Sequence, residues 1–205
     1  ASDVVNEHGK VNMVFNNAGV SVTDTAENMP YEDFEWLMNI NFWGVIYGCK
    51  SFLPHFHEVE EAHIINTSSI FGIVAVPSQS AYNASKFAVR GYSYAMRQEL
   101  LDSHIGVSCV QPGGIKTNII KSSRYTTADN TAATKEEFIS RFNEFAGLTS
   151  EQAAEQIRRG VLANKARILV GRDAKTAAIV ERIAPTGYQT LLSKLVNSLL
   201  NDKST

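Results

Sequence analysis

Short apolar runs alternate with longer segments that carry apolar residues at helical spacing along most of the chain. Four of the short runs are rich in β-branched and other apolar residues, which is typical of strands covered on both faces. They are Val11–Phe15, Ile64–Asn66, Ile105–Val110 and Arg167–Gly171. Strands that alternate with helices indicate βα units joined in a parallel sheet. The pattern therefore predicts an α/β fold.

The segments with helical spacing lie between turn-forming residues. Apolar residues from Phe42 to Phe56 predict a long buried helix that Pro54 would bend near its end. A second long helix is expected over Ser80–Leu101, and Thr149 or Ser150 is the expected N-cap of a later one. The other predicted helices are Ser2–His8, Tyr31–Asn39, Glu136–Phe145, Ser150–Leu162, Asp173–Ile183 and Tyr188–Leu200.

The chain of 205 residues is long enough for one sizeable core, and no shift in composition or internal repeat divides it. We therefore expect residues 1–205 to form a single domain. The sequence from Lys116 to Thr134 is polar and rich in Ser, Thr and Asn, which is long for a loop in a compact domain. Residues 116–147 are the candidate substrate lid within that domain.

Charge and composition exclude several classes of function. The formal net charge is -2 and the pI is about 6.2, so we expect no binding to nucleic acid. No apolar run approaches the length of a membrane span, and no signal sequence opens the chain. Cys49 and Cys109 are expected to be buried and unpaired, which fits a reducing, cytoplasmic setting. His55 and His57 lack further ligands at metal-binding spacing, so no metal is expected.

Candidate chemistry concentrates between Ser68 and Lys86. Tyr82 and Lys86 are four residues apart, so their side chains share one face of the predicted helix. An ammonium beside a phenol favours the phenolate and lowers the pKa of the phenol, and Ser69 is placed to bond the same substrate oxygen. Ser68 adjoins Ser69, and a shift of one residue would exchange their directions. The spacing favours Ser69 and predicts a proton-transfer site.

Three polar or glycine-containing turns follow predicted strands. They comprise Asn16–Gly19, Ser68–Ser69 and Pro112–Thr117. Ligands of parallel α/β sheets gather outside the carboxyl ends of the strands, where all three turns would lie. We therefore expect the three turns to meet at one site.

Taken together in order, these motifs resemble those of the short-chain dehydrogenase/reductase family. Each motif is weak alone, since Tyr-x-x-x-Lys arises often by chance, but the ordered set is specific. The match covers most of Val11–Gly171. The motifs are Asn16-Asn17-Ala18-Gly19, Asn41-x-x-Gly44, Ser69 thirteen positions before Tyr82, Tyr82-x-x-x-Lys86, and Pro112-Gly113-x-x-x-Thr117.

The resemblance implies NAD(P)-dependent interconversion of a secondary alcohol and a ketone or aldehyde. By the same resemblance Tyr82 is the general acid or base, Ser69 holds the carbonyl oxygen, and Lys86 lowers the tyrosine pKa and binds the nicotinamide ribose. Asn41 would anchor a water that links Lys86 to solvent. The implied cofactor-binding residues are Asn17, Ala18, Gly19, Tyr82, Lys86, Pro112, Gly113, Ile115 and Thr117.

The sequence departs from the family pattern at one point. It contains no TGxxxGxG turn to cradle a pyrophosphate, and the residue that selects NAD or NADP is absent as well. We therefore expect a doubly wound, Rossmann-like parallel sheet with only the last four strands of the family sheet. Its first strand, Val11–Phe15, would expose an apolar edge, which suggests a longer polypeptide or a covering chain. Cofactor binding and activity of residues 1–205 alone are expected to be poor.

The resemblance also bears on partners. A homodimer or homotetramer is expected, paired through the two long helices. The substrate is expected to be a small alcohol or carbonyl compound. Apolar residues between Ser69 and Tyr82 fit an apolar pocket wall, although core packing explains them equally well. The alternative is a non-catalytic member of the same fold that binds a nucleotide or a partner.

Overall fold

The structure, a computed structural model, describes residues 1–125 and 146–190. In chain order its elements are α1 (Ser2–His8), β1 (Met13–Asn16), β2 (Val22–Thr23), α2 (Tyr31–Met38), a π-helical segment (Asn39–Trp43), α3 (Gly44–Phe56), β3 (Ala62–Thr67), a 3₁₀ turn (Ile70–Gly72), α4 (Ser80–Glu99), β4 (Ile105–Pro112), β5 (Arg124–Tyr125), α6 (Ser150–Leu162), β6 (Arg167–Val170) and α7 (Arg172–Ile183).

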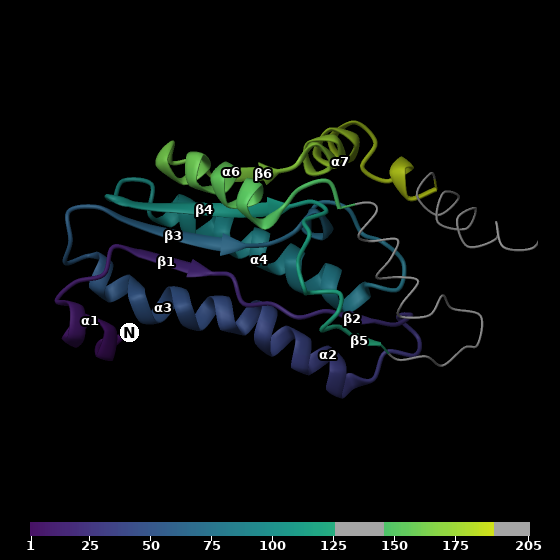
Figure 1. Ribbon diagram of the computed structural model, residues 1–205, viewed down its shortest axis with the longest axis horizontal. Helices are drawn as coiled ribbons and strands as arrows, with labels where there is room; N and C mark the ends of the chain where they lie inside the picture. Colours follow the sequence, from purple (N-terminus) through teal and green to yellow (C-terminus); the bar gives the residue numbers. More distant parts are fainter. Residues whose placement is uncertain (126–145, 191–205) are drawn as a thin grey trace, which may run out of the picture.

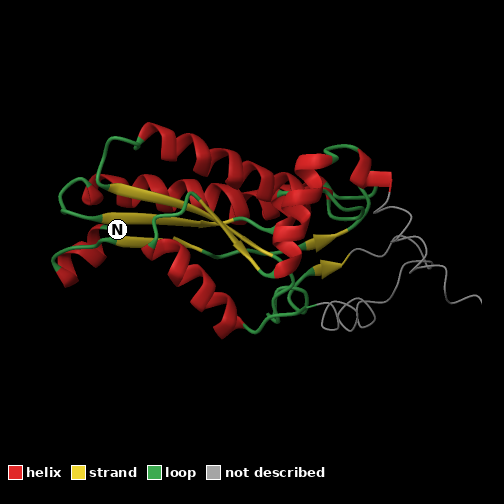
Figure 2. Ribbon diagram, turned by 90° about the horizontal axis from the view of Figure 1, so that it is seen from above, coloured by secondary structure: helices red, strands yellow, loops and turns green. Residues whose placement is uncertain are grey.

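The main sheet is parallel throughout, with the strand order β1-β3-β4-β6. Helices cover both of its faces, with α6 above the sheet and α3 below it in Figure 1. Figure 2 shows the same strands from above, running side by side between the helices. Both the predicted α/β class and the four predicted strands are confirmed.

Each face of the sheet has its own apolar core. Side chains of α3 and α4 pack with Ile64 and Val107 on one face, while α6 packs with Ile65 and Val110 on the other. Ile64 and Ile65 are neighbours on β3, and alternate residues of a strand point to opposite faces. The near-continuous apolar character of β3 and β4 follows because both of their faces are buried.

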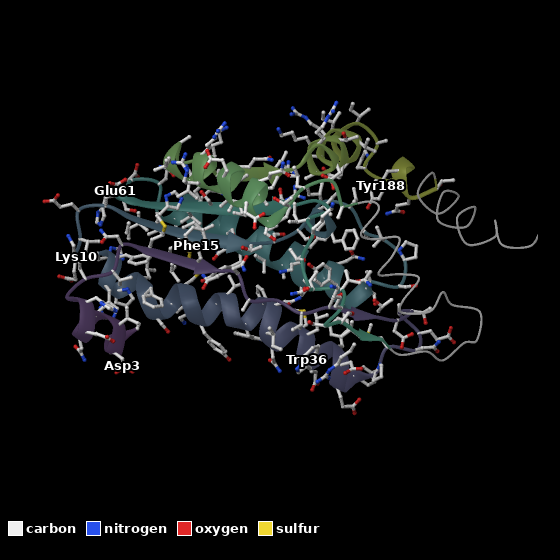
Figure 3. The ribbon with its side chains drawn as sticks, viewed as in Figure 1. Asp3, Lys10, Phe15, Trp36, Glu61 and Tyr188 are labelled. Carbon is white, nitrogen blue, oxygen red and sulfur yellow. The ribbon has the colours of Figure 1, made fainter. Side chains whose placement is uncertain are left out.

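Strand β1 lies at an edge of the sheet and pairs with β3 in the described part of the chain. Val14 packs into the core between the sheet and α3. Met13 and Phe15 point the other way and are 46% and 52% exposed. Phe15 is labelled beside this strand in Figure 3. The expected exposure of an apolar edge is therefore confirmed.

The helical stretch from Tyr31 to Phe56 differs from the prediction of two simple helices. Helices α2 and α3 are continuous, and five residues of π-helix, Asn39–Trp43, join them. A π-bulge inserts an extra residue into the helical repeat and is common at functional sites. It changes which side chains face inward, and here it buries Asn41 completely.

Several expectations on smaller elements are confirmed or corrected. Helix α6 has the predicted bounds, and Thr149 rather than Ser150 is its N-cap, in a capping box with Gln152. Strands β2 and β5 form a short parallel pair that the sequence analysis does not predict, because the pair depends on a contact between distant parts of the chain. The predicted helix 136–145, most of 188–200 and most of the candidate lid lie outside the described residues.

Cys49 and Cys109 are both buried and free, as expected. In the described ranges, every helix is too short or too polar to cross a membrane.

The junction between the 3₁₀ turn and α4 generates a prediction about stability. A Cβ atom at Gly72 would collide with Ser68 Oγ and the backbone of Lys86, whereas one at Gly91, on the exposed face of α4, would meet nothing within 4 Å. We expect Gly72→Ala to lower the free energy of unfolding by about 1–3 kcal/mol. Gly91→Ala should raise it by about 0.5–1 kcal/mol, because alanine is the better helix former. Urea unfolding of both variants measures this, and equal effects would contradict the close packing at Gly72.

Candidate active site

The connection from β3 to α4 brings the predicted site residues together. Ser68 is buried, and its hydroxyl donates a 2.7 Å hydrogen bond to the backbone oxygen of Lys86. Ser69 Oγ instead accepts from the backbone N–H of Phe71 at 3.1 Å and forms a hydrogen bond with Tyr82. Ser68 therefore fixes the helix to the strand end, and Ser69 is the serine that faces the phenol, in agreement with the spacing.

Tyr82 lies in the first turn of α4 and is 9% exposed. The ring of Phe71 packs against it edge-on, with centroids 5.9 Å apart. Burial raises the pKa of Tyr82 to about 12, and the hydrogen bond with Ser69 offsets part of that rise. The net direction is a rise, so burial outweighs any lowering of this pKa by the ammonium of Lys86. The Lys86 Nζ atom lies 5.5 Å from the ring centroid.

Lys86 is 3% exposed. Its Nζ atom donates a 3.0 Å hydrogen bond to the backbone oxygen of Thr67, at the end of β3. Burial lowers the pKa of this ammonium to about 8, so it is mostly protonated at pH 7. An ammonium has three N–H donors, and the bond to Thr67 uses one of them.

Asn41 holds the turn after β1 in place. Its Oδ1 atom accepts from the Val20 N–H at 2.8 Å, and its Nδ2 atom donates to the Val20 oxygen at 2.9 Å and to Ser85 Oγ at 3.2 Å. A Cβ atom at Gly19 would lie 3.4 Å from both Asn41 Oδ1 and Lys86 Nζ. The glycine thus leaves bare backbone beside the buried ammonium.

The residues of the turn that follows Pro112 differ in their contacts and in their exposure. The N–H of Gly114 donates to Asp173 Oδ2 at 2.5 Å, and a Cβ atom at Gly113 would collide with that carboxylate. Ile115 packs in the core between the sheet and α6 rather than at the surface, so only its backbone is available to a ligand. Thr117 is exposed.

Thr117 borders an open cavity of about 470 Å³. Tyr82 and Ser69 are not among the residues that line it, which are Lys116, Thr117, Asn118, Lys121 and Ser150. The cavity lies at the end of β4, on the side where α6 begins. The structure therefore places Thr117 at the edge of a polar recess.

Asn17 and Ala18 are exposed at the end of β1, and the Asn17 Oδ1 atom accepts from the Thr67 hydroxyl at 3.1 Å. Asn16 pairs with Asn66 across the sheet through a 2.8 Å amide hydrogen bond. Asn66 in turn donates to Ser93 at 3.0 Å and is completely buried. This chain of hydrogen bonds joins β1, β3 and α4 beneath the site.

Sequence reasoning missed two residues that shape the site. Asp173 holds the glycine turn from the first turn of α7, where an acidic residue is an ordinary helix signal. The Tyr188 hydroxyl accepts from the backbone N–H of Ala75 at 3.0 Å and thereby ties the C-terminal part of the chain to the loop before Tyr82. Tyr188 is labelled in Figure 3, close to the C-terminal end of the described residues. Neither contact leaves a local sequence signal.

The family model described as short chain dehydrogenase matches residues 1–128. The chain belongs to the short-chain dehydrogenase family. Its members are oxidoreductases that use NAD or NADP, and this chain is an oxidoreductase of that class acting on CH–OH groups.

Two relatives and one solved structure give the extent of the likeness. SadH of Mycobacterium tuberculosis, an oxidoreductase by name, is 42% identical over 94% of this chain and 70% of its own length. The 3-ketodihydrosphingosine reductase of Bacteroides thetaiotaomicron is 41% identical over 56% of this chain, which spans 42% of that protein. A short chain dehydrogenase/reductase from Burkholderia phymatum in complex with NAD has a TM-score of 0.77 at 24% identity, covering 92% of this chain and 71% of the other. That structural likeness concerns the fold.

The residues present fit a dinucleotide on the nicotinamide side. Gly19 leaves space beside Lys86 that any side chain would fill, and the Lys86 ammonium has donors left for the hydroxyls of a ribose. In the described ranges, no group of three or more His, Cys, Asp or Glu side chains is arranged to hold a metal ion.

The burial of Lys86 generates a prediction about pH. Its pKa falls from an ordinary 10.5 to about 8 in the folded protein. Between these values the unfolded chain binds more protons than the folded one, so this lysine makes the protein more stable as the pH rises through that window. We expect the loss of the proton from Lys86 to raise the free energy of unfolding by about 2–3 kcal/mol across this pH window.

Lys86→Met removes this contribution, and the comparison with the wild type cancels the titration of all other groups. Urea unfolding at pH 7 and pH 10 should show the wild type gaining about 2–3 kcal/mol relative to the variant. Lys50→Met, at an exposed lysine on α3, is the control that removes a charge without burial. A difference between wild type and Lys86→Met that is the same at both pH values would contradict the buried ammonium.

Proposed function

We propose that the protein interconverts a secondary alcohol and a ketone or aldehyde, with Tyr82 as the proton donor in reduction and acceptor in oxidation. The observation that carries the proposal is the convergence of three side chains from two elements. Ser69 and Tyr82 are hydrogen-bonded to each other, and the Lys86 ammonium is buried beside them. A phenol and an ammonium are rarely buried together unless chemistry requires them.

The protonation states suit the reducing direction at neutral pH. A phenol with a pKa of about 12 is protonated, so Tyr82 is ready to give its proton to the alkoxide that develops as a carbonyl is reduced. The Ser69 hydroxyl bonds the same oxygen. The positive charge of Lys86 stabilises the phenolate that remains, in a site with little water to screen it. Bound NAD(P)H supplies the hydride for this reaction.

Lys86 is also placed to pass the proton on. Its ammonium contacts Thr67, and Asn41 lies nearby, since a Cβ atom at Gly19 would be 3.4 Å from both Lys86 Nζ and Asn41 Oδ1. A water held near Asn41 would link the ammonium to solvent and restore the proton that Tyr82 gives up. The support for this relay is the complete burial of Asn41 and its place in a π-helical segment, which is an unusual local geometry.

The cofactor is proposed to lie along the carboxyl ends of β1, β3 and β4. Gly19 and Lys86 would face its nicotinamide ribose, and Asn17 and Ala18, exposed at the end of β1, would lie toward the adenosine. The backbone of Pro112, Gly113 and Ile115, with the exposed Thr117, would shape the nicotinamide pocket. The turn is preformed for this role because Asp173 holds it.

The substrate is proposed to be a small ketone or secondary alcohol with an apolar body. Phe71 packs against Tyr82, and Val74 and Val76 are half-buried in the loop that follows. This loop is fixed from outside by Tyr188. The name of the B. thetaiotaomicron relative states that it reduces a 3-keto compound, which supports a ketone as the oxidised partner.

A homodimer or homotetramer in the cytoplasm completes the proposal. Aromatic side chains are exposed on the π-helical segment, α3 and α4, where Trp43, Tyr47 and Phe87 are 45%, 63% and 38% exposed. Exposed aromatic residues are typical of subunit contacts. The two free cysteines fit a reducing compartment.

Replacement of Tyr82 tests the catalytic proposal. We expect Tyr82→Phe to lower kcat/KM for carbonyl reduction by about 10²–10⁴-fold, because the proton donor is lost while the ring and its packing remain. NAD(P)H oxidation against a panel of ketones measures this in the full-length protein. Tyr31→Phe, at an exposed tyrosine of α2, should keep the wild-type rate. Equal rates for the wild type and Tyr82→Phe would favour the non-catalytic alternative.

The two neighbouring serines give a matched pair. Ser69→Ala removes the hydroxyl that faces Tyr82, so we expect kcat to fall by at least about tenfold, together with a loss of about 0.5–2 kcal/mol of stability because the N–H of Phe71 loses its acceptor. Ser68→Ala removes a buried hydrogen bond to α4, so it should lower the free energy of unfolding by about 1 kcal/mol and change kcat little. Steady-state kinetics and urea unfolding separate the two effects. The assignment of Ser69 fails if Ser68→Ala has the larger effect on kcat.

A further inference from the structure

Arg124, the first residue of β5, makes two contacts with helix α2. Its Nη1 atom donates a 2.6 Å hydrogen bond to Asp33 Oδ1, and its guanidinium carbon lies 3.6 Å from the centroid of the Trp36 ring. Asp33 and Trp36 are three residues apart, so they share one face of α2, where Figure 3 labels Trp36. A guanidinium that is both paired and stacked on a ring has a defined orientation, because it is planar.

The backbone of Arg124 is attached to the segment that follows β1. Its N–H donates to the Ser21 oxygen at 3.0 Å, and the Ser123 hydroxyl donates to the same oxygen at 3.0 Å. Strand β5 pairs with β2 over two residues, with Val22 opposite Arg124. So short a pair of strands has little stability of its own. The contacts of Arg124 with α2 therefore help to hold β5 in place.

Strand β2 is connected in turn to the start of α4. Gln79, the N-cap residue of α4, is buried and donates from Nε2 to Thr23 Oγ1 at 2.8 Å. Its Oε1 atom accepts from Ser21 Oγ at 3.3 Å. Tyr82 lies three residues further on, in the first turn of α4. Hydrogen bonds thus run from the strand pair to the helix that carries the proposed proton donor.

The turn before β5 packs beside the proposed site. Its backbone is closed by bonds from the Ser122 N–H to the Asn118 oxygen at 3.0 Å and from the Ser123 N–H to the Ile120 oxygen at 3.1 Å. Ile119, in this turn, is half-buried against an apolar cluster, and Trp36 packs on the same cluster. The members of that cluster are Val22, Leu37, Ala81 and Tyr82.

Residues 116–124 are therefore fixed at both ends. At the first end the Lys116 N–H donates to the Leu148 oxygen at 2.9 Å, and at the other Arg124 bonds α2. The Arg124 and Asp33 side chains are 47% and 20% exposed. An exposed ion pair contributes little to the stability of a whole protein. The expected consequence of this contact is local, in the placement of residues 116–124.

We propose that Arg124 is a positioning residue, which sets the affinity for the alcohol or carbonyl substrate by holding residues 116–124 against the cluster that includes Tyr82. The inference rests on the proposed function, since it takes this cluster as one wall of the substrate site. Arg124 contacts α2 and not the phenol, so its loss leaves the proton donor in place. A released segment must be ordered by the substrate itself, and the apparent affinity falls by the fraction of molecules in the competent arrangement.

Steady-state reduction of a neutral ketone by the full-length protein tests the proposal, at saturating NAD(P)H. We expect Arg124→Gln to raise KM for the ketone about five- to tenfold and to change kcat less than twofold, because binding is weakened and the chemistry is kept. The neutral substrate excludes a direct effect of the lost charge. Arg158→Gln removes an arginine that is paired with Glu155 on α6 and should keep the wild-type KM.

Variants of Trp36 test the contact from its other side. Trp36→Leu removes the aromatic face, so it should raise KM as Arg124→Gln does, whereas Trp36→Phe keeps a ring and should raise KM less. The double variant Arg124→Gln/Trp36→Leu should have no higher KM than the more affected single variant, because both changes remove one contact. KM values that multiply in the double variant would contradict the proposal.

Hydrogen exchange gives a readout that does not depend on activity. The amides of Ser123 and Arg124 should exchange at least tenfold faster in Arg124→Gln than in the wild type, because their bonds to Ile120 and Ser21 open more often. An unchanged exchange rate, or an unchanged KM in a protein that turns over, overturns this inference alone. Equal turnover by the wild type and Tyr82→Phe, or none by the wild type, overturns the proposed function as well.

Discussion

The site depends on the burial of the Lys86 ammonium between the end of β3 and the first turns of α4. Burial of a lone charge is unfavourable, and one backbone oxygen, that of Thr67, compensates it directly. The surrounding structure holds it there, since Ser68 bonds the backbone of the same residue and Gly72 allows the close approach of the turn. Burial keeps the phenol of Tyr82 protonated and holds the ammonium of Lys86 beside it, although burying that charge is unfavourable. The two groups together form an electrostatic environment that is prepared for a developing negative charge.

The sheet supplies the rigidity that this arrangement needs. β3 and β4 are covered on both faces, and the amide pair of Asn16 and Asn66 links β1 to β3 beneath the site. Buried hydrogen bonds of this kind fix one register, because any slip would leave amide groups unsatisfied. The turns at the carboxyl ends of the strands are thereby held at one level. Asn41 and Asp173 then fix the two turns that carry Gly19 and Gly113.

The two ends of α4 have different electrostatic character. Tyr82 and Lys86 lie near its beginning, where one buried cation faces a proton donor. Arg97 lies near its end, where guanidinium groups bond neutral oxygens beside a cavity. One helix thus carries the proposed catalytic residues in its first turns and, near its end, an arginine that fixes it to β4 and to the loop before β6.

The sequence by itself determined the α/β class, the four parallel strands, the bounds of α6 and the grouping of Ser69, Tyr82 and Lys86. Each of these follows from local periodicity or from spacing within one strand–turn–helix unit. Only the tertiary structure decided the π-helical segment at Asn41, the pairing of β2 with β5, and the contacts of Asp173 and Tyr188, because all of them depend on residues distant in the chain. It also decided that the net shift of the pKa of Tyr82 is a rise. Spacing places Lys86 near the phenol, but the extent of burial decides which effect dominates, and burial is a property of the whole fold.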